Sequence, residues 1–376
     1  PPVEPNTPLS QDHKSYPHSE HPTVTPLETC NMLNASGRRS ATAPPRAPSL
    51  DELLPTFGPV APPRVLTRST GMSAAASTAS CDDQPMPAPK SLAEAASRAD
   101  WHLWSASVTA EIEGFHRLGV YERRDLSSLP PGASVLNSKI VMVNKFDGPK
   151  FVKRKSRWVI VGTGSEPAVQ YDPFGCSTSP VARPSLLAML AFSAHFGFAM
   201  RQLDVTQAFL QSFLPSPNVF VRFPKGYDAP LGDDGRPQVA RAIRGWYGLR
   251  DAPAAWDKLL STFMVHACGF TRSKSDPSVY FKRDPKVCPT KRNPGAGLTI
   301  VAFFVDDALI VSWKKSVADA VVKTIGKRFP ITDLGKPKYL VGARISDRLD
   351  NAGRRCISMD MQSYIAETLN ELNMSD

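Results

Sequence analysis

A strongly apolar β pattern toward the C-terminal end of the chain meets at two adjacent acids. Residues 298–305 and 308–312 are almost entirely apolar, and only Asp306 and Asp307 separate them. Two β runs joined by a two-residue polar connection are typical of a tight hairpin. We therefore expect the chain to fold back between these runs, with both carboxylates at the tip.

Apolar residues at helical spacing predict a series of helices. The first begins near Ser91 and continues to Gly119 as one element. Proline near the start and glycine after the end delimit a helix at 184–195, before Gly197, and another between Asp251, as its N-cap, and Gly269. Two more helices are expected at 317–329 and from about residue 362.

Shorter β patterns lie between the helices. Strands at 135–143 and 158–161 would form a hairpin of modest length around the turn signal at residues 147–148. A strand at 198–205 carries Asp204 into an otherwise apolar run. Further strands are expected at 219–224, 239–243, 339–342 and 356–359, with Leu334 and Gly335 in a turn.

The first 90 residues differ in composition from the rest. They are rich in Pro, Ser and Ala, and 17 of the 36 prolines lie within the first 100 residues. Such a segment cannot bury enough apolar surface to offset the entropy of ordering. We expect residues 1–90 to be a disordered linker from an upstream part of a longer polyprotein, or a simple spacer, and residues 91–376 to fold.

Charge changes the picture, because the chain is basic, with a formal net charge of +10 and a pI near 9.3. Residues 139–157 carry a net +6 over 19 residues. A solvated basic loop is the ordinary explanation of such a run. On a hairpin, however, alternate side chains share a face and could bind phosphates together, so nucleic acid is the expected partner.

Neither a disulfide framework nor a membrane anchor is indicated. The six cysteines form no CxxC pair and have no zinc-type histidine spacing. No stretch of about 18 apolar residues could span a bilayer, and no secretory signal pattern begins the chain. We expect a reduced, intracellular, soluble protein with no membrane partner.

The acids at strand ends are the candidate chemistry. Adjacent carboxylates in apolar surroundings repel each other unless cations compensate, and divalent metal ions are one solution. A solvated turn is the alternative for Asp306 and Asp307. Asp204 alone would most simply cap the turn that follows it. Asp204 and Asp306 lie 102 positions apart and could share metals if their strands meet.

Several motifs in one order resemble the reverse transcriptase of copia-type long-terminal-repeat retrotransposons. The central segments are 202–210 around Asp204, 247–253 around Gly248, and 304–307 around Asp306. Lead-in segments match as well, at 119–122, 137–139, 157–162 and 179–183. The resemblance covers roughly residues 95–376 and is specific, because independent motifs recur in one order.

This resemblance implies an α+β fold of the right-hand polymerase type, with fingers from the basic hairpin, an antiparallel-sheet palm backed by helices, and a partial thumb. Asp204 and Asp306 match the family's two metal-binding aspartates, and Asp307 its second motif acid. All three are candidate catalytic and metal-binding residues for two Mg²⁺ ions, which Mn²⁺ could replace. Adjacent strand residues point to opposite faces, so we rank Asp307 below Asp306.

Further site residues are implied by the same match. Arg157 looks like the fingers arginine that contacts the incoming triphosphate, with Lys145 as a companion. Phe209 matches the aromatic residue that screens the sugar 2′ position. That role requires the backbone to turn after Asp204, and a core aromatic is the alternative. Gly248 matches the segment beneath the template–nucleotide pair, and residues 334–335 match the primer-holding turn.

The chain departs from the family pattern at three places. Phe304 stands where tyrosine is usual, Asp251 stands where glutamine is common, and residues 175–178 widen a normally tighter junction. None of these departures removes a candidate metal ligand.

The implied function is an RNA-directed DNA polymerase that adds deoxynucleotides to a primer by two-metal-ion nucleotidyl transfer. Its implied partners are an RNA template, a DNA or tRNA primer, deoxynucleoside triphosphates, and integrase and RNase H domains of the full-length element. The implied location is a cytoplasmic virus-like particle, with a nuclear phase as an option. The alternatives are a catalytically silent retroelement remnant that binds nucleic acid and, less favoured, a nucleotide cyclase.

Overall fold

The computed structural model describes residues 85–147, 150–161, 180–215, 218–372 and 374, all within the unit Phe57–Asp376. Most of the predicted linker and residues 175–178 therefore lie outside the described residues. The last residues assigned to the linker contact the folded domain. The carbonyl of Met86 accepts a hydrogen bond from the Asn144 side chain at 2.9 Å, and the carbonyl of Pro87 accepts one from the Arg98 side chain at 2.7 Å.

The described residues form an α+β fold with three sheets. The first sheet has the order β1-β6-β5-β2-β3. Its strands are β1 (Tyr121–Arg124), β2 (Val135–Asp147), β3 (Lys150–Val161), β5 (Phe220–Arg222) and β6 (Val239–Ala242). The predicted basic hairpin is confirmed as β2 and β3, but it is longer than expected, with strands of 13 and 12 residues. Strand β1 had not been predicted.

The helix expected from Ser91 to Gly119 is two helices, α1 (Leu92–Ser97) and α2 (Trp101–Leu118). Arg98 has extended backbone between them, and its guanidinium donates to Asp100 at 3.0 Å. The apolar spacing shifts at this break, because Ala95 and Trp101 are six positions apart and would fall on different sides of one continuous helix. The sequence prediction overlooked this shift. Gly119 ends α2 in the left-handed conformation, with φ 59°, as its position predicted.

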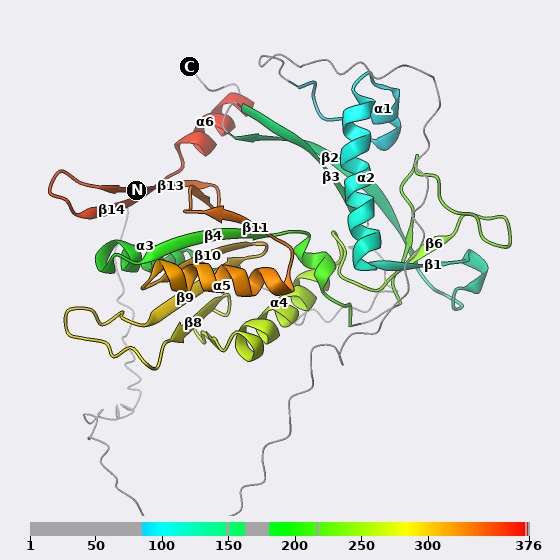
Figure 1. Cartoon of the computed structure of the whole chain (residues 1–376). Coiled ribbons are helices and arrows are strands. Elements are labelled where there is room, and N and C mark those ends of the chain that lie inside the picture. Colours follow the sequence, from blue (N-terminus) through cyan, green and yellow to red (C-terminus); the bar gives the residue numbers. More distant parts are fainter. Residues whose placement is uncertain (1–84, 148–149, 162–179, 216–217, 373, 375–376) are drawn as a thin grey trace, which may run out of the picture. The chain divides into compact units, whose positions relative to one another are not determined.

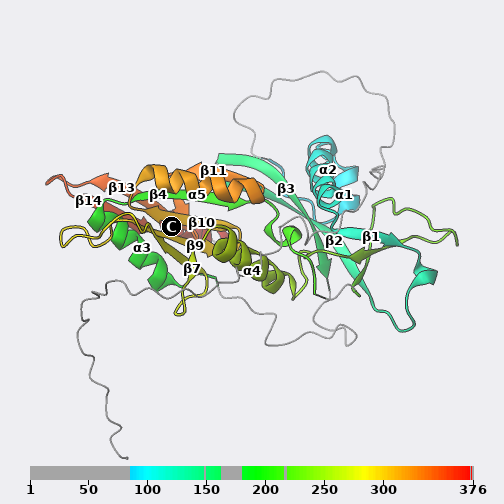
Figure 2. The same cartoon turned by 60° about the horizontal axis from the view of Figure 1, so that its bottom comes forward.

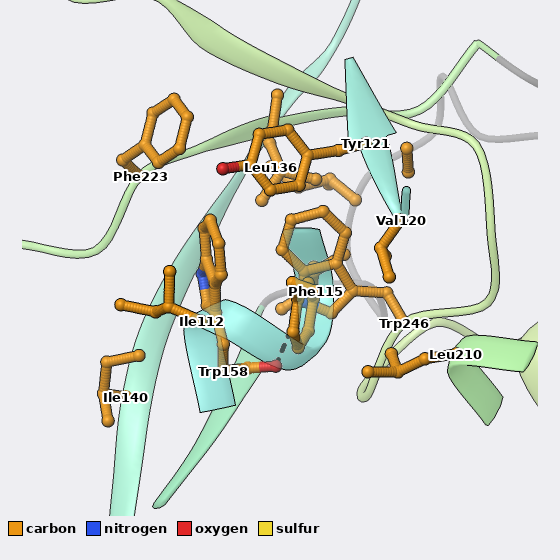
Figure 3. Packing of buried hydrophobic residues seen from close by; sticks show 14 of the residues in the cluster. Ile112, Phe115, Val120, Tyr121, Leu136, Ile140, Trp158, Leu210, Phe223 and Trp246 are labelled. Atoms are coloured by element: carbon orange, nitrogen blue, oxygen red, sulfur yellow. Dashed lines mark hydrogen bonds between the residues drawn. The ribbon is translucent and has the colours of Figure 1, made fainter. Parts of the chain in front are cut away.

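Helix α2 lies against the β2–β3 hairpin (Figure 1). An aromatic core fills the contact between them. The rings of Phe115, Trp158 and Trp246 lie 4.7–5.1 Å apart, centroid to centroid, and Figure 3 shows them turned toward one another. The indole N–H of Trp246 donates to the carbonyl of Trp158 at 3.0 Å, which satisfies a buried donor. This core fixes β3 relative to α2.

The second sheet is antiparallel throughout, in the order β11-β4-β10-β9-β8-β7. Its strands are β4 (Ala199–Val205), β7 (Thr271–Arg272), β8 (Val279–Arg283), β9 (Leu298–Phe304), β10 (Asp307–Ser312) and β11 (Ile331–Gly335). Strands β7 and β8 had not been predicted. Leu334 and Gly335, expected in a turn, lie instead in β11, which pairs with β4 through a bulge.

Helices cover both faces of this sheet (Figure 2). Ala308 and Ile310 of β10 pack with α4 (Ala252–Thr262), its π-helical extension (Phe263–Ala267) and α5 (Lys315–Arg328). Leu309 and Val311 pack with α3 (Arg183–Phe196) on the other face. Burial on both faces explains the continuous apolar run that predicted this strand.

The third sheet joins β12 (Tyr339–Leu340), β13 (Ala343–Leu349) and β14 (Arg355–Asp360), and α6 (Gln362–Glu371) follows it. The strand expected at 339–342 is shorter, because Val341 and Gly342 adopt positive φ and turn the chain into β13. Strand β13 was missed because its second half is polar. No helix in the described ranges is long and apolar enough to cross a membrane.

Candidate active site

Two of the candidate acids face each other across neighbouring strands. Asp204, near the end of β4, pairs directly with Asp307, the first residue of β10. Residues directly opposite in an antiparallel pair project to the same face of the sheet. Asp204 also pairs with Thr332 of β11, so its backbone lies within the sheet. The N-cap position of the short helix that follows is held by Gln207 and not by Asp204.

The tip of the acidic hairpin lies one residue earlier than the sequence predicted. Phe304 pairs with Asp307, so Val305 and Asp306 form the connection. Val305 has φ 61°, a conformation that β-branched residues rarely adopt. Two hydrogen bonds hold the tip: Trp256 Nε1 donates to the Val305 carbonyl at 2.9 Å, and Val205 N–H donates to the Asp306 carbonyl at 2.8 Å.

This shifted tip changes the relation between the acids. Asp307 is a strand residue that shares a face with Asp204, whereas Asp306 is a turn residue tied to the end of β4 through its own carbonyl. Asp307 was ranked below Asp306 because adjacent strand residues point to opposite faces, but only Asp307 belongs to a strand, and Asp306 lies in the turn. All three acids are half-buried, which is not the environment of a fully solvated turn.

The electrostatics show how closely the acids interact. Burial raises the pKa of Asp204, and the negative charge of Asp306 raises it further. Burial also raises the pKa of Asp307, and the charges of Asp306 and Asp204 add to that effect. Gln202 Nε2 donates to Asp307 at 3.4 Å and to the Tyr339 carbonyl at 2.8 Å. The acids thus form one mutually repelling cluster.

The donor chemistry of this cluster fits Mg²⁺. Such ions are commonly bound by one or two carboxylates together with substrate phosphates and waters. In the part of the chain that the structure describes, no group of three or more His, Cys, Asp or Glu is arranged to hold a metal. A metal here would therefore depend on carboxylates of this cluster together with oxygens that the substrate brings.

Basic side chains from β3 oppose the acids. The positive charges of Lys155, Lys153 and Arg157 lower the pKa of Asp204 against the effects of burial. These three residues alternate along the strand and so share one face. Lys145, predicted as the companion of Arg157, pairs with Lys153 across the hairpin. The hairpin thus presents cations toward the acid cluster.

Lys155 lies on the same strand face as Arg157, and it belongs to the basic run at 139–157, although it was not named as a candidate site residue. Burial lowers the pKa of its ammonium, and the charges of Asp204 and Asp306 partly restore it. The sequence could have indicated Lys155, because it lies two residues before Arg157 in the predicted hairpin and therefore on the same face of the strand. The resemblance alone directed attention to Arg157.

Phe209 follows the turn that its predicted role requires. Gln207 adopts φ 53° and ψ 46°, and a short 3-10 helix (Ala208–Gln211) begins after it. The ring of Phe209 is half-buried and lies 6.2 Å from that of Tyr247, at an interplanar angle of 66°. It also packs against the cores of the first and second sheets. Both the core and the sugar-contacting interpretations remain compatible with this position.

Gly248 is explained by a close approach of the chain to itself. Its φ is 94°, and a Cβ there would lie 2.2 Å from the carbonyl oxygen of Ile160 in β3. The amide of Ile160 donates to the Tyr247 carbonyl at 2.8 Å, and the Arg157 guanidinium lies 5.7 Å from the Tyr247 ring centroid. The segment around Gly248 therefore supports the strand that carries Arg157.

The departures from the family pattern leave these positions intact. Phe304 is half-buried and packs on the α3 side of the second sheet. Asp251 occupies the N-cap position of α4 but makes no side-chain capping hydrogen bond. Neither residue alters the three acids.

Comparison with known proteins adds an independent line of evidence. Residues 121–376 match the family described as "Reverse transcriptase (RNA-dependent DNA polymerase)". Helices α1 and α2 lie before the matched residues.

Among curated relatives, the Pol polyprotein of transposon TNT 1-94 from Nicotiana tabacum is 28% identical over 290 residues, which cover 77% of this chain and 20% of the relative. The Pol polyprotein of transposon RE2 from Arabidopsis thaliana is 26% identical over 242 residues, which cover 64% of this chain and 15% of the relative. The chain thus spans about a fifth or less of the length of these relatives.

A solved structure, foamy viral protease-reverse transcriptase in complex with dsDNA, aligns with a TM-score of 0.38 at 13% identity, covering 71% of this chain and 43% of that one. The family match covers well over half of the present sequence. The chain therefore belongs to the reverse transcriptase (RNA-dependent DNA polymerase) family, in the group that includes copia-type transposon Pol polyproteins.

Proposed function

We propose that this chain is the polymerase part of a retrotransposon Pol polyprotein, and that it extends a primer with deoxynucleotides on an RNA template by two-metal-ion nucleotidyl transfer. The observation that carries the proposal is the pairing of Asp204 with Asp307 on one face of the second sheet, with Asp306 tied to the end of β4 in the adjoining turn. The charges of Lys155, Lys153 and Arg157 on one face of β3 lower the pKa of Asp204, which supports placing the basic face near these acids. Acids suited to metal ions and cations suited to a triphosphate thus lie at one place.

Asp204 and Asp306 would hold Mg²⁺, or Mn²⁺ in its place, and Asp307 would contribute a carboxylate from the same sheet face as Asp204. The chemistry that such ions supply is a lower pKa of the primer 3′-hydroxyl and stabilisation of the leaving pyrophosphate. The second sheet holds the acids in place, because β4 and β10 are paired along their length.

The remaining residues bind and orient the substrates. Arg157 and Lys145, with Lys155, would neutralise the triphosphate. Phe209 would lie against the deoxyribose, and the segment around Gly248 beneath the template–nucleotide pair. In β11, Leu334 is 45% exposed and Gly335 pairs with Gln202, which suits a strand edge that contacts the primer.

The net charge of +10 supports binding to a template–primer duplex, because release of condensed counterions favours cationic proteins on nucleic acid. A DNA or tRNA primer, an RNA template and deoxynucleoside triphosphates are the proposed partners. Integrase and RNase H domains would belong to the same polyprotein, and cytoplasmic virus-like particles with a later nuclear phase are the proposed location.

The deciding experiment is primer extension on poly(rA)/oligo(dT) with and without Mg²⁺. Extension should depend on the metal and should be abolished by Asp204→Asn and by Asp306→Asn, while both variants still bind the template–primer. Asp350→Asn, in the turn between β13 and β14, is the matched control and should extend normally. Duplex binding without any extension by the wild-type chain would instead identify a silent remnant.

A further inference from the structure

Helix α2 contains an acid that its apolar stripe does not explain. Glu111 is 8% exposed and lies between Val108 and Phe115 on the buried side of the helix. A buried carboxylate is unfavourable unless hydrogen bonds compensate for its lost hydration. Burial raises the pKa of Glu111 accordingly.

The partners of this carboxylate lie in two segments of the candidate active site. One oxygen accepts from the backbone N–H of Trp158 at 3.3 Å, directly after Arg157 in β3. The other accepts from Gln207 Nε2 at 3.2 Å, in the turn before Phe209. One side chain of α2 therefore joins the strand that carries Arg157 to the turn that carries Phe209.

A glycine on the same helix makes room for this contact. A Cβ at Gly114 would lie 2.3 Å from Gln207 Nε2 and 2.5 Å from its Oε1. Glycine in a helix interior is less favourable than alanine, so its presence here has a cost to the helix. Glycine at this position thus leaves room on the surface of α2 for the same Gln207 amide that donates to Glu111.

The backbone of Gln207 needs such support. It is in the left-handed region, which non-glycine residues adopt only when the surroundings hold them there. The turn directs Phe209 toward Tyr247, whose ring also lies under the Arg157 guanidinium. A change in the Gln207 rotamer would therefore alter the position of Phe209 relative to Arg157.

We propose that Glu111 is a positioning residue for nucleotide selection: through Gln207 and the Trp158 amide, it holds Phe209 and Arg157 in fixed relation, so that α2 sets the discrimination between deoxyribose and ribose. The inference rests on the proposed polymerase function and on the contact of Phe209 with the sugar. Gly114 serves the same end by admitting the Gln207 side chain.

The test uses the full chain and compares kcat/KM for dTTP and UTP on poly(rA)/oligo(dT). Glu111→Gln, Gly114→Ala and Gln207→Ala should each lower the dTTP/UTP ratio about tenfold, equivalent to about 1.4 kcal/mol. Glu111→Gln combined with Gln207→Ala should lower it little further, because Glu111→Gln removes the charge from the contact and Gln207→Ala removes the contact itself, so both act on one interaction. Glu113→Gln, at an exposed position of the same helix, is the matched control and should keep the wild-type ratio.

A purely structural role gives a different result. General loss of folded protein lowers kcat/KM for both nucleotides by one factor and leaves the ratio unchanged. Gln207→Ala introduces no steric clash. It therefore still tests the proposal if a substitution within α2 prevents folding.

Hydrogen–deuterium exchange over residues 206–211 provides a readout that does not need activity, and it should be faster in these variants than in the Glu113→Gln control. An active wild type whose variants keep the wild-type ratio would overturn the role of Glu111 in nucleotide selection, whatever their exchange rates, while leaving the polymerase proposal intact. An inactive wild type would overturn the polymerase proposal and with it the role of Glu111 in nucleotide selection.

Discussion

Gly248 offers a test of the fold and of the candidate site together. Its φ is 94°, and an added Cβ would lie 2.2 Å from the Ile160 carbonyl oxygen and 3.3 Å from the Ile160 nitrogen. Both neighbours are backbone atoms of β3, which is held to Tyr247 by a 2.8 Å hydrogen bond. Gly248→Ala must therefore move β3 away from Tyr247 or rotate the backbone at residue 248.

The loss of folding stability in Gly248→Ala has two sources, the left-handed backbone and the steric overlap. Left-handed backbone costs alanine about 1–2 kcal/mol, and forcing extra atoms into a packed region costs about 1–3 kcal/mol. Gly353, in the turn between β13 and β14, has φ 72° and nothing within 4 Å of an added Cβ. Gly353→Ala incurs only the first cost, so Gly248→Ala should be less stable than this control by about 1–3 kcal/mol.

Urea unfolding measures that difference. With an m-value of about 3 kcal/mol/M, the midpoint of Gly248→Ala should lie about 0.3–1 M below that of Gly353→Ala. Primer extension should also fall in Gly248→Ala, because displacement of β3 moves Arg157 away from the acids. Equal midpoints for the two variants would refute the close approach of β3. Normal stability with lost extension would show that the space at Gly248 is reserved for a ligand.

Two further predictions concern Phe209 and Asp347. Phe209→Val should accept ribonucleotides far better, with only a modest loss of dTTP incorporation in primer extension, because the bulky ring no longer opposes a 2′-hydroxyl; loss of both activities together with thermal stability would identify core packing. The hydrogen bond and charge of Arg355, with Lys336, hold the pKa of Asp347 below its ordinary value of 3.8. The carboxylate therefore stabilises the fold above pH 3.8, and this contribution is lost as the pH falls through the lower folded-state pKa. Urea unfolding of Asp347→Asn should show a loss of about 1.5–3 kcal/mol at pH 7 that shrinks in acid; a loss independent of pH would contradict the ion pair.

Local signals in the sequence determined much of the fold. Proline and glycine placed the ends of α3, since Arg183–Phe196 is followed by Gly197 in the left-handed conformation. Apolar runs predicted β9 and β10, because strands buried on both faces need apolar residues at every position. The sequence alone also singled out Asp204, Asp306 and Asp307 as candidates, since acids that end apolar strands are conspicuous, and the structure places them on neighbouring strands and the turn between β9 and β10.

Other features were decided only by tertiary structure, because they depend on partners distant in the sequence. The hairpin tip falls at Val305 and Asp306, where hydrogen bonds from Trp256 and Val205 hold a backbone conformation that no propensity favours. Strand β13 is polar along its second half and exists through its pairing with β14.

The same reason explains what the sequence could not reveal about the site. Glu111 and Gln207 are separated by 96 positions, and neither belongs to a pattern that predicts their contact. Glu111 interrupts an apolar stripe, which signals a buried polar group without naming its partner. That partner was decided when packing of α2 on β3 brought the helix against the turn before Phe209, because hydrogen bonds between distant residues form only where the packed elements place them.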